Sequence, residues 1–429
     1  MINTSSYRKG MFRVFLAAYF LLYIVPSTPF FLPETLLLLS FLTFVIVEDP
    51  DWSSWWQDSI LFWLAVFCGW MSLTSLIDGF FLTGYYREWF EAGVLVPVLA
   101  LFKTLLIRPL MVVFMLVHLL KDDSDQERLF IKGLLFLVLG KLLPLGYVDY
   151  IQNTGWLTGH HFTAYAHYNL TASLLNLFFP FILYEMYSAN RLSTQFLWIV
   201  LFYANFNAVY MTQSRGGIIA MFFSLGVFGL IFLVSRFSTK NLSCTTALAV
   251  GVIFFAWINP AGDYTAKRFD KTQYSGVEDS VKKTLQTGSP VSGLSGRVTH
   301  IWPRTREVFL EQPWIGYTLD SYRNLMLETF GSELEFDPTH PHNFYLQLLF
   351  EGGIIGFILF HILAFHILRV PLRLFVESSF RLIGVVSVPV AVFSEVYFHG
   401  VVAMFDYHWL ILIIPWVYVF REIDPGSTN

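Results

Sequence analysis

Apolar segments long enough to cross a membrane recur along almost the whole chain, separated by short polar connections. A membrane-spanning helix needs about 20 consecutive apolar residues. The pattern therefore predicts an all-α polytopic membrane protein with about twelve transmembrane helices. The predicted segments lie near residues 11–25, 30–47, 59–77, 89–120, 129–146, 166–187, 195–211, 216–235, 243–259, 343–368, 380–398 and 402–420.

One of these segments, 89–120, is too long for a single crossing. Lys103, Arg108 and Pro109 interrupt its apolar run. Because proline cannot continue a helix from within, we expect a broken or partly interfacial helix here.

A large polar loop, residues 260–342, divides the membrane segments into two groups. Residues 1–259 are expected to hold transmembrane helices 1–9, and residues 343–429 helices 10–12. Within the loop, residues 275–296 are rich in Ser, Gly, Lys and Thr, which indicates a mobile stretch. After Arg297 the apolar positions recur at helical spacing and predict an amphipathic helix. Pro303 either kinks this helix or marks its start, and Pro313 ends it.

Charge gives the expected orientation, since basic residues favour the cytoplasmic side of a membrane. In the twelve-span arrangement, one side receives Arg8, Lys9, Arg13, Lys121, Arg128, Arg191, Arg236, Lys240, Arg369, Arg373 and Arg381. We assign that side to the cytoplasm. The loop 260–342, Arg87 and Arg215 then lie on the opposite face, where basic residues break the trend and indicate anion binding.

Composition narrows the function. The chain has 429 residues, of which 55% are hydrophobic and 14% charged, and a net charge of -4. These values provide no basic stripe for nucleic acid. The first apolar segment lacks a small-residue cleavage site, so we expect it to be a retained span. Cys68 and Cys244 lie in or beside apolar segments, which argues against a disulfide framework, a zinc site or a thiol nucleophile.

Candidate chemistry begins at the tenth predicted span. Asn343, Gln347 and Glu351 follow one another at four-residue steps and share one helix face. Polar side chains within a membrane usually face a bundle interior or a wet cavity. Pro341 suits a first helical turn, which would place His342 in that turn at the membrane surface.

His342 has three interpretations. It is a helix-start histidine bonded to a loop carbonyl, a metal ligand together with His340, or a general base beside a hydroxyl nucleophile. The metal interpretation lacks a third ligand at fixed spacing.

A second candidate is the sequence TQSRGG at 212–217, between two predicted spans. Ser214 is a good N-cap for the following helix, whose positive end would then lie beside the Arg215 guanidinium. Together they suit a phosphate. The alternative is an arginine that reaches the lipid headgroups as an anchor. Gly216 and Gly217 favour function because they allow close approach of backbone or ligand.

These motifs together resemble the O-antigen ligase and O-antigen polymerase superfamily. The motifs are SRGG at 214–217, Arg297 with Trp302, Pro313 to Gly316, and His342 and Asn343 followed by Gly353 and Gly356. The spacing from His342 to Gly356 matches the ligase pattern completely, and residues 159–172 are similar to the outer loop before the superfamily's sixth span. The similarity covers residues 150–365. Thr318 departs from it, standing where the superfamily often has the second glycine of Gly-x-Gly, and so does His167-Tyr168-Asn169, in place of an asparagine-rich turn.

The resemblance implies an O-antigen ligase of lipopolysaccharide biosynthesis in the bacterial inner membrane, with a periplasmic active site and a fold like that of the GT-C-like glycosyltransferases. The donor would be a glycan on undecaprenyl diphosphate, and the acceptor a sugar hydroxyl of lipid A core oligosaccharide. The acidic Asp-x-Asp pairs at 49–51 and 123–125 fall on the cytoplasmic side. Arginine would therefore replace a metal, and transfer would invert configuration without a cofactor.

The roles implied for individual residues follow from that chemistry. His342 would be the catalytic base, while Arg215 and Arg297 would stabilise the leaving diphosphate. The expected substrate-binding residues are Asn343, His340, Arg87, Ser214 and Gly216.

Three other functions stay open. Two come from the same superfamily: an O-antigen polymerase and a protein O-oligosaccharyltransferase. The third is a lipid-glycan transporter, which should carry polar residues in corresponding spans of two halves. In this sequence they gather in the second half.

Overall fold

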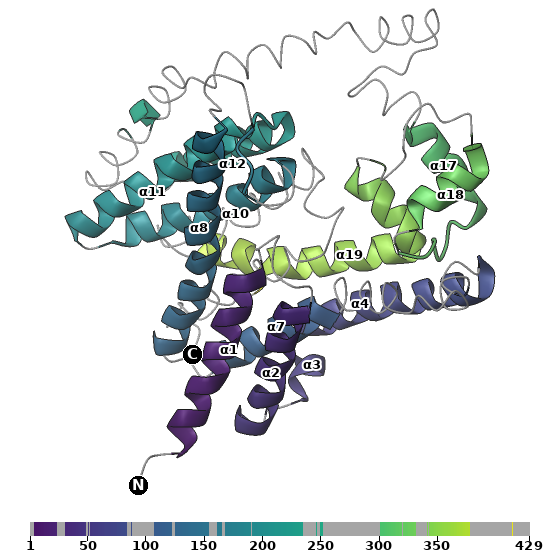
Figure 1. Cartoon of the computed structure of the whole chain (residues 1–429), viewed down its shortest axis with the longest axis horizontal. Helices are drawn as coiled ribbons and strands as arrows, with labels where there is room; N and C mark the ends of the chain where they lie inside the picture. The colour runs from purple at the N-terminus through teal and green to yellow at the C-terminus, as the bar shows by residue number, and fades with distance from the viewer. Residues whose placement is uncertain are drawn as a thin grey trace, which may run out of the picture.

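The computed structural model of the chain describes residues 4–23, 31–48, 50, 52–83, 87, 107–121, 125–153, 161–164, 168–189, 191–234, 246, 249–251, 301–319, 321–331, 341, 343–377 and 414. Helices dominate these ranges, and no strand occurs within them (Figure 1). The helices are α1 Thr4–Tyr23, α2 Phe31–Glu48, α3 Ser54–Gln57, α4 Ser59–Ile77, α7 Arg108–Lys121, α8 Asp125–Gln152, α10 Tyr168–Ser188, α11 Leu192–Met211, α12 Arg215–Val234, α17 Trp302–Glu311, α18 Tyr322–Phe330 and α19 Phe344–Glu377.

Five helical stretches are long and apolar enough to cross a membrane: Ser59–Leu82, Leu129–Gln152, Tyr168–Tyr187, Leu192–Met211 and Phe344–Arg369. Each lies at a position predicted from the hydropathy pattern. Shorter apolar helices occupy Met11–Leu22, Thr35–Glu48, Arg108–Leu120 and Arg215–Gly226. The chain is therefore an all-α membrane protein over its described part. The predicted span 380–398 and most of the spans 243–259 and 402–420 lie outside the described residues, so the twelve-span count stays a prediction.

Arg108 and Pro109, two of the residues expected to interrupt the segment 89–120, lie at the start of a helix. Helix α7 begins at Arg108, and Pro109 occupies its first turn, where the missing N–H removes no helical hydrogen bond. Residues 88–106 are outside the described ranges. The break predicted within 89–120 therefore stays a prediction.

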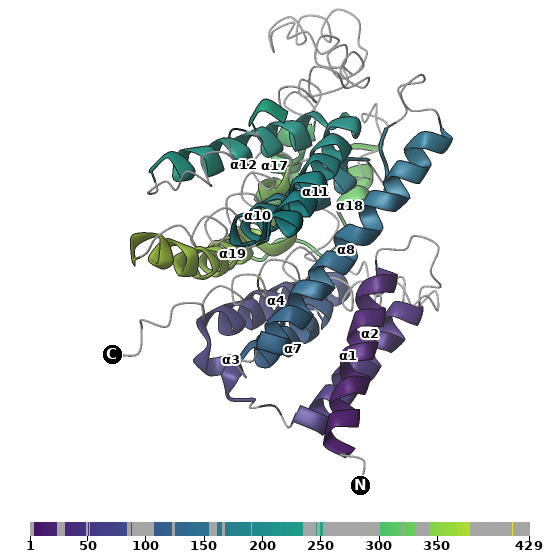
Figure 2. The same cartoon turned by 90° about the vertical axis from the view of Figure 1, so that its left-hand side faces the viewer.

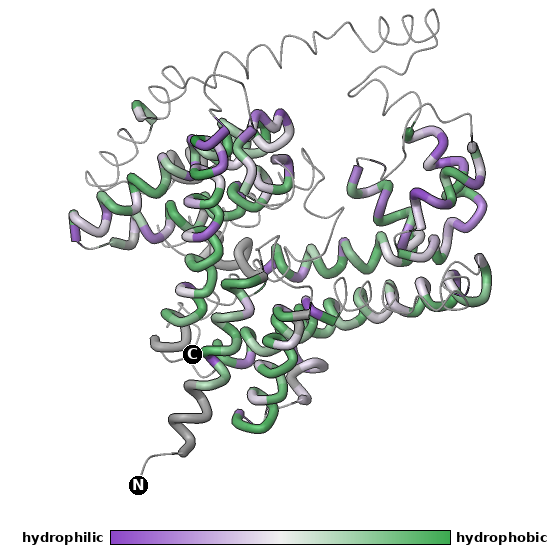
Figure 3. The backbone as a smooth tube through the Cα atoms, viewed as in Figure 1, coloured by the Kyte–Doolittle hydropathy of each residue, from purple (hydrophilic) through white to green (hydrophobic). Residues whose placement is uncertain are grey.

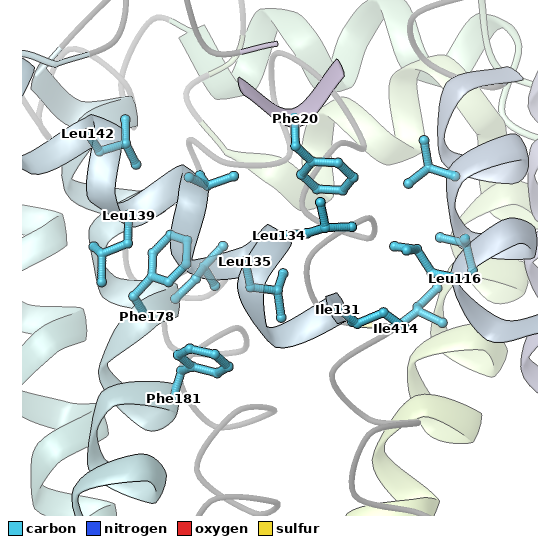
Figure 4. Packing of buried hydrophobic residues seen from close by; sticks show 14 of the residues in the cluster. Phe20, Leu116, Ile131, Leu134, Leu135, Leu139, Leu142, Phe178, Phe181 and Ile414 are labelled. Atoms are coloured by element: carbon cyan, nitrogen blue, oxygen red, sulfur yellow. The ribbon is translucent and has the colours of Figure 1, made fainter. Parts of the chain in front are cut away.

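Helix α8 lies in the main hydrophobic core. Figure 2 shows it passing between the α1–α2 pair and the group formed by α10, α11 and α12. Figure 4 shows its buried leucines beside side chains from the neighbouring helices, including Phe20 of α1, Leu116 of α7 and Phe178 of α10. Near one end of α8, Lys132 pairs with Glu185 of α10 at 2.6 Å, which reduces the cost of placing two charges in an apolar bundle.

Helices α4 and α19 pack side by side in opposite directions. The Trp70 indole Nε1 donates to the Gly352 carbonyl at 2.9 Å. Phe67 contacts Phe360, and Trp63 stacks on His366. Residue numbers therefore fall along α4 as they rise along α19. Both helices are largely apolar, whereas α17 and α18, at one end of the pair, alternate polar and apolar residues (Figure 3).

A kink at Gly353 interrupts α19. Gly353 has φ 64° and ψ -172°, a conformation that is essentially restricted to glycine. The kink separates the Ile354 N–H from the Phe350 carbonyl, which would be partners in a straight helix. The turn after α17 satisfies both groups: Ile354 N donates to the Pro313 carbonyl at 2.9 Å, and Tyr317 N donates to the Phe350 carbonyl at 2.7 Å.

The kink and the turn fit together through two glycines. A Cβ on Gly353 would lie 2.3 Å from the Trp314 carbonyl oxygen, and a Cβ on Gly316 would lie 2.4 Å from the Gly353 nitrogen. Gly316 also has a positive φ, 71°. Both glycines belong to the motifs singled out in the sequence, and the structure gives them a common purpose: two backbone segments approach too closely for any side chain.

We expect Gly353→Ala to destabilise the protein. The added methyl group combines backbone strain of about 1–3 kcal/mol with collisions against backbone atoms that cannot rotate away. The melting temperature of the purified protein in detergent should fall clearly. Gly69→Ala in α4 is the matched control, because its Cβ would meet nothing within 4 Å. Equal melting temperatures for the two variants would contradict this description of the kink.

Candidate active site

The turn before α12 forms as the sequence predicted. Ser214 caps the helix: its Oγ accepts from Gly217 N at 3.3 Å, and its carbonyl accepts from Ile218 N at 2.8 Å. Thr212 Oγ1 accepts from Ser214 N at 3.2 Å. These bonds fix the first turn of α12, whose first residue is Arg215. The arginine is half-buried, and the dipole of α12 adds positive potential at this end.

Gly217, the second of the two glycines after Arg215, allows α12 to pack closely against α10. A Cβ on Gly217 would lie 2.7 Å from the Cβ of Ala172 in α10, so only glycine allows the two helices to lie this close. Asn176 Nδ2 donates to the Gly217 carbonyl at 2.8 Å. The sequence analysis expected the glycine pair to allow close approach of backbone or ligand. At Gly217 the group that approaches is helix α10. Gly216 is half-buried.

A short segment before α10, residues 161–164, braces the same turn. Phe162 is fully buried, and its N–H donates to the Met211 carbonyl at 3.1 Å, at the end of α11. Its ring packs against Tyr147 of α8. Ala164 N donates to Thr171 Oγ1 at 3.2 Å. Arg215 therefore begins a helix whose N-terminus is held by α8, α10 and α11 together.

Asn343 caps α19. Its Oδ1 accepts from Tyr345 N at 2.9 Å and from Leu346 N at 3.2 Å, so the helix begins at Phe344. The expectation that Pro341 occupies the first helical turn is therefore wrong. Pro341 precedes the cap, because the asparagine side chain satisfies the first N–H groups of the helix. His342 lies outside the described residues. Asn343 itself takes a structural role that the sequence analysis did not assign.

The polar face predicted for α19 is present and buried. Gln347 Nε2 donates to Glu351 Oε1 at 2.6 Å, and Gln347 N donates to the Asn343 carbonyl at 3.0 Å. Gln347 is 8% exposed and Glu351 is 6% exposed. The four-residue spacing thus brings these two side chains together inside the protein, away from lipid.

The amphipathic helix predicted after Arg297 is α17, and its boundaries resolve the ambiguity about the prolines. It begins at Trp302 with Pro303 in its first turn and ends at Glu311, two residues before Pro313. Pro303 therefore marks the start of the helix. Trp302 Nε1 donates to the Pro341 carbonyl at 3.0 Å, which ties α17 to the residues immediately before α19.

A buried carboxylate, Asp78, was missed by the sequence analysis. It begins the π-helical turn η1 (Asp78–Leu82) that extends α4, and it is fully buried. Its Oδ2 accepts from Thr318 N at 2.6 Å and from Thr318 Oγ1 at 2.7 Å. Its Oδ1 accepts from Gln312 Nε2 at 3.1 Å. The available signal was an isolated acidic residue at the end of an apolar run.

Two tyrosines in or next to the α17–α18 connection, Tyr317 and Tyr322, stay protonated at neutral pH. Burial raises the pKa of Tyr317 to about 12, and the carboxylates of Glu311 and Asp78 act in the same direction. Burial also raises the pKa of Tyr322 to about 12, although its hydrogen bond with Thr305 opposes the shift. Tyr317 donates to the Val308 carbonyl at 2.9 Å. These phenols therefore stabilise the α17–α18 unit and are unsuited to act as bases.

The structure describes only part of the predicted site. Ser214, Arg215 and Gly216 lie together at the start of α12, and Asn343 lies at the start of α19. Arg87 is exposed. His340, His342 and Arg297 lie outside the described residues. That Arg215 and His342 act in the same active site is therefore a proposal.

Comparisons with known proteins agree with the motifs. Residues 199–361 match the family described as O-antigen ligase. A candidate polysaccharide ligase of Rickettsia conorii is 28% identical over 256 residues, which cover 57% of this chain and 56% of that protein. A candidate polysaccharide ligase of Rickettsia typhi is 26% identical over 255 residues, again 57% of this chain and 56% of the relative. The chain thus matches little more than half the length of these relatives. Over residues 199–361, from α11 to α19, the chain is therefore similar to the O-antigen ligase family.

Proposed function

We propose that the protein transfers a glycan from undecaprenyl diphosphate to a sugar hydroxyl of lipid A core oligosaccharide, as an inverting and metal-independent O-antigen ligase. The observation that carries this proposal is the position of Arg215. It stands at the capped and braced N-terminus of α12, inside the segment that matches the ligase family. A lipid diphosphate is the anion that such a site would hold.

The proposed orientation places this site on the periplasmic face of the bacterial inner membrane. It assumes twelve spans, both termini in the cytoplasm, and the loop 260–342 in the periplasm. The antiparallel packing of α4 and α19 supports the arrangement locally, since an odd and an even span should run in opposite directions.

Arginine is suited to the leaving group for two reasons. Its guanidinium keeps its charge at any accessible pH, and its forked N–H groups bind phosphate oxygens in pairs. The positive end of the α12 dipole would further favour the same anion. We propose Arg215 as the principal contact, Arg297 as the second and Arg87 as a third. Ser214 and Gly216 would lie against the bound diphosphate.

In the proposed reaction His342 accepts the proton of the acceptor hydroxyl. The hydroxyl oxygen attacks the anomeric carbon from the face opposite the diphosphate. A new glycosidic bond forms as the bond to the phosphate oxygen breaks, and the lipid diphosphate leaves with the electron pair. His340 would contact substrate from the loop side. Asn343 would hold His342 in place by ending the turn that carries it.

Arg215→Lys should be far less active than the wild type, because lysine keeps the positive charge but loses the two-pronged donor geometry. Loss of one such contact in a shielded site costs on the order of 3 kcal/mol, or about a hundredfold in rate. Transfer by the purified protein measures the effect. Arg191→Lys is the control and should keep the wild-type activity. Arg191 occupies the N-cap position of α11, whereas Arg215 follows the end of that helix. If both variants were fully active, Arg215 would be a membrane anchor only.

His342→Ala should abolish turnover while leaving donor binding largely intact, because only the proton acceptor is removed. In the wild type, transfer should weaken as the pH falls below about 6.5, where a free imidazole becomes protonated. His340→Ala should lose less. The assay uses lipid-linked donor and lipid A core acceptor. Undiminished transfer by His342→Ala would rule out this base, and a glycan that lengthened on its lipid carrier would assign a polymerase.

A further inference from the structure

The buried carboxylate of Asp78 is not used by the proposed chemistry. Every partner that the structure gives it in the described part of the chain is neutral: Thr318, Gln312 and, at 3.4 Å, Thr83. Neutral donors only partly replace the hydration that a buried carboxylate loses. The positions of these donors in the chain indicate what the carboxylate holds in place.

Asp78 binds the first and the last residue of the turn 312–318. Gln312 directly follows α17, and Thr318 closes the turn. Thr318 Oγ1 makes a further contact with the Ser75 carbonyl at 3.2 Å, and Leu319 N donates to Ser75 Oγ at 3.2 Å. The end of α4 therefore grips both ends of one turn.

That turn is the one that completes the kink in α19. Its Pro313 carbonyl accepts from Ile354 N, and Tyr317 N donates to the Phe350 carbonyl. A displacement of the turn would leave these two groups of α19 without their partners. The carboxylate of Asp78 is thus connected, through two layers of hydrogen bonds, to the course of α19.

Helix α17 extends the connection to the residues around position 342. Its last turn is held through Gln312, and at its first residue Trp302 donates to the Pro341 carbonyl. Asn343 caps α19 on the other side. Pro341 is therefore bound to α17 and Asn343 to α19, while Asp78 of η1 binds the turn that links α17 to α19 by hydrogen bonds.

We propose that Asp78 is a positioning residue of the transfer reaction, which holds the turn 312–318 and thereby Pro341 and Asn343, the two neighbours of His342 in the chain. This inference rests on the proposed function. It also explains Thr318, which departs from the family pattern: a glycine would keep the N–H donor, but only a hydroxyl residue supplies the second bond to Oδ2.

Asp78→Asn tests the proposal with little change in size. The amide replaces one carboxylate oxygen by an NH₂ group, which then faces a donor of Thr318 or of Gln312. We expect kcat to fall by on the order of tenfold to a hundredfold, as for a small misplacement of a catalytic group, with KM for the lipid-linked donor close to the wild-type value. Thr318→Val should lower kcat by a smaller factor, because only the hydroxyl bond to Asp78 is lost. Thr318→Ser keeps that hydroxyl and should keep the wild-type kcat.

Ser72→Ala is the matched control. Ser72 lies in the same helix, and its Oγ donates within that helix to the Cys68 carbonyl at 2.9 Å. This variant should keep the wild-type kcat. Wild-type kcat in both Asp78→Asn and Thr318→Val would overturn the proposal. A rise in donor KM without a fall in kcat would also overturn it, since that result would place Asp78 in donor binding.

A second readout does not depend on catalysis. In a background with Cys68→Ala and Cys244→Ser, a thiol introduced by His342→Cys reports on the segment 341–343 directly. Its alkylation rate by a water-soluble maleimide should change several-fold when Asp78→Asn is added, and should not change with Ser72→Ala. An unchanged rate would overturn the positioning role. If His342→Ala proved active, the proposed function would fall, while the alkylation result would still decide whether Asp78 holds this segment.

Discussion

The rest of the structure around α19 depends on one broken helical hydrogen bond. At Gly353 the Ile354 N–H and the Phe350 carbonyl lose each other as partners. A membrane helix cannot leave such groups unsatisfied in an apolar environment. The turn 312–318 supplies partners for both groups, and these bonds hold α17 against α19. The same turn is bound to α4 through Asp78, so three elements distant in sequence meet at one place.

Within residues 199–361, a second place is held by several contacts in addition to the kink at Gly353. It is the start of α12. There the Ser214 cap, the contact of Gly217 with α10, and the bond from Phe162 to the end of α11 hold the backbone that presents Arg215. The two places differ in kind. One holds a guanidinium beside a positive helix end, and the other holds the residues around position 342. A reaction that expels a diphosphate from the donor and removes a proton from the acceptor hydroxyl needs both functions beside one reacting carbon.

Local rules predicted much of this arrangement. Hydropathy located the helices, the cap at Ser214 followed from its residue type, and four-residue spacing predicted the pairing of Gln347 with Glu351. The start of α19 was misplaced because two signals compete there, a proline suited to the first turn and an asparagine suited to the cap. The cap prevailed. Asp78 could not be interpreted from sequence, since its partners lie about 240 positions away, in a loop whose path depends on the kink. The glycine motif indicated that Gly353 mattered, but only three-dimensional packing explains its role.

The central claim is that arginine, and no divalent metal, stabilises the leaving diphosphate while His342 takes the proton. The most direct test is glycan transfer by the purified protein from lipid-linked donor to lipid A core acceptor, measured with and without EDTA. The account predicts equal rates. Activity that disappears with EDTA and returns with magnesium or manganese would contradict it, and His340 and His342 would then have to be considered as metal ligands.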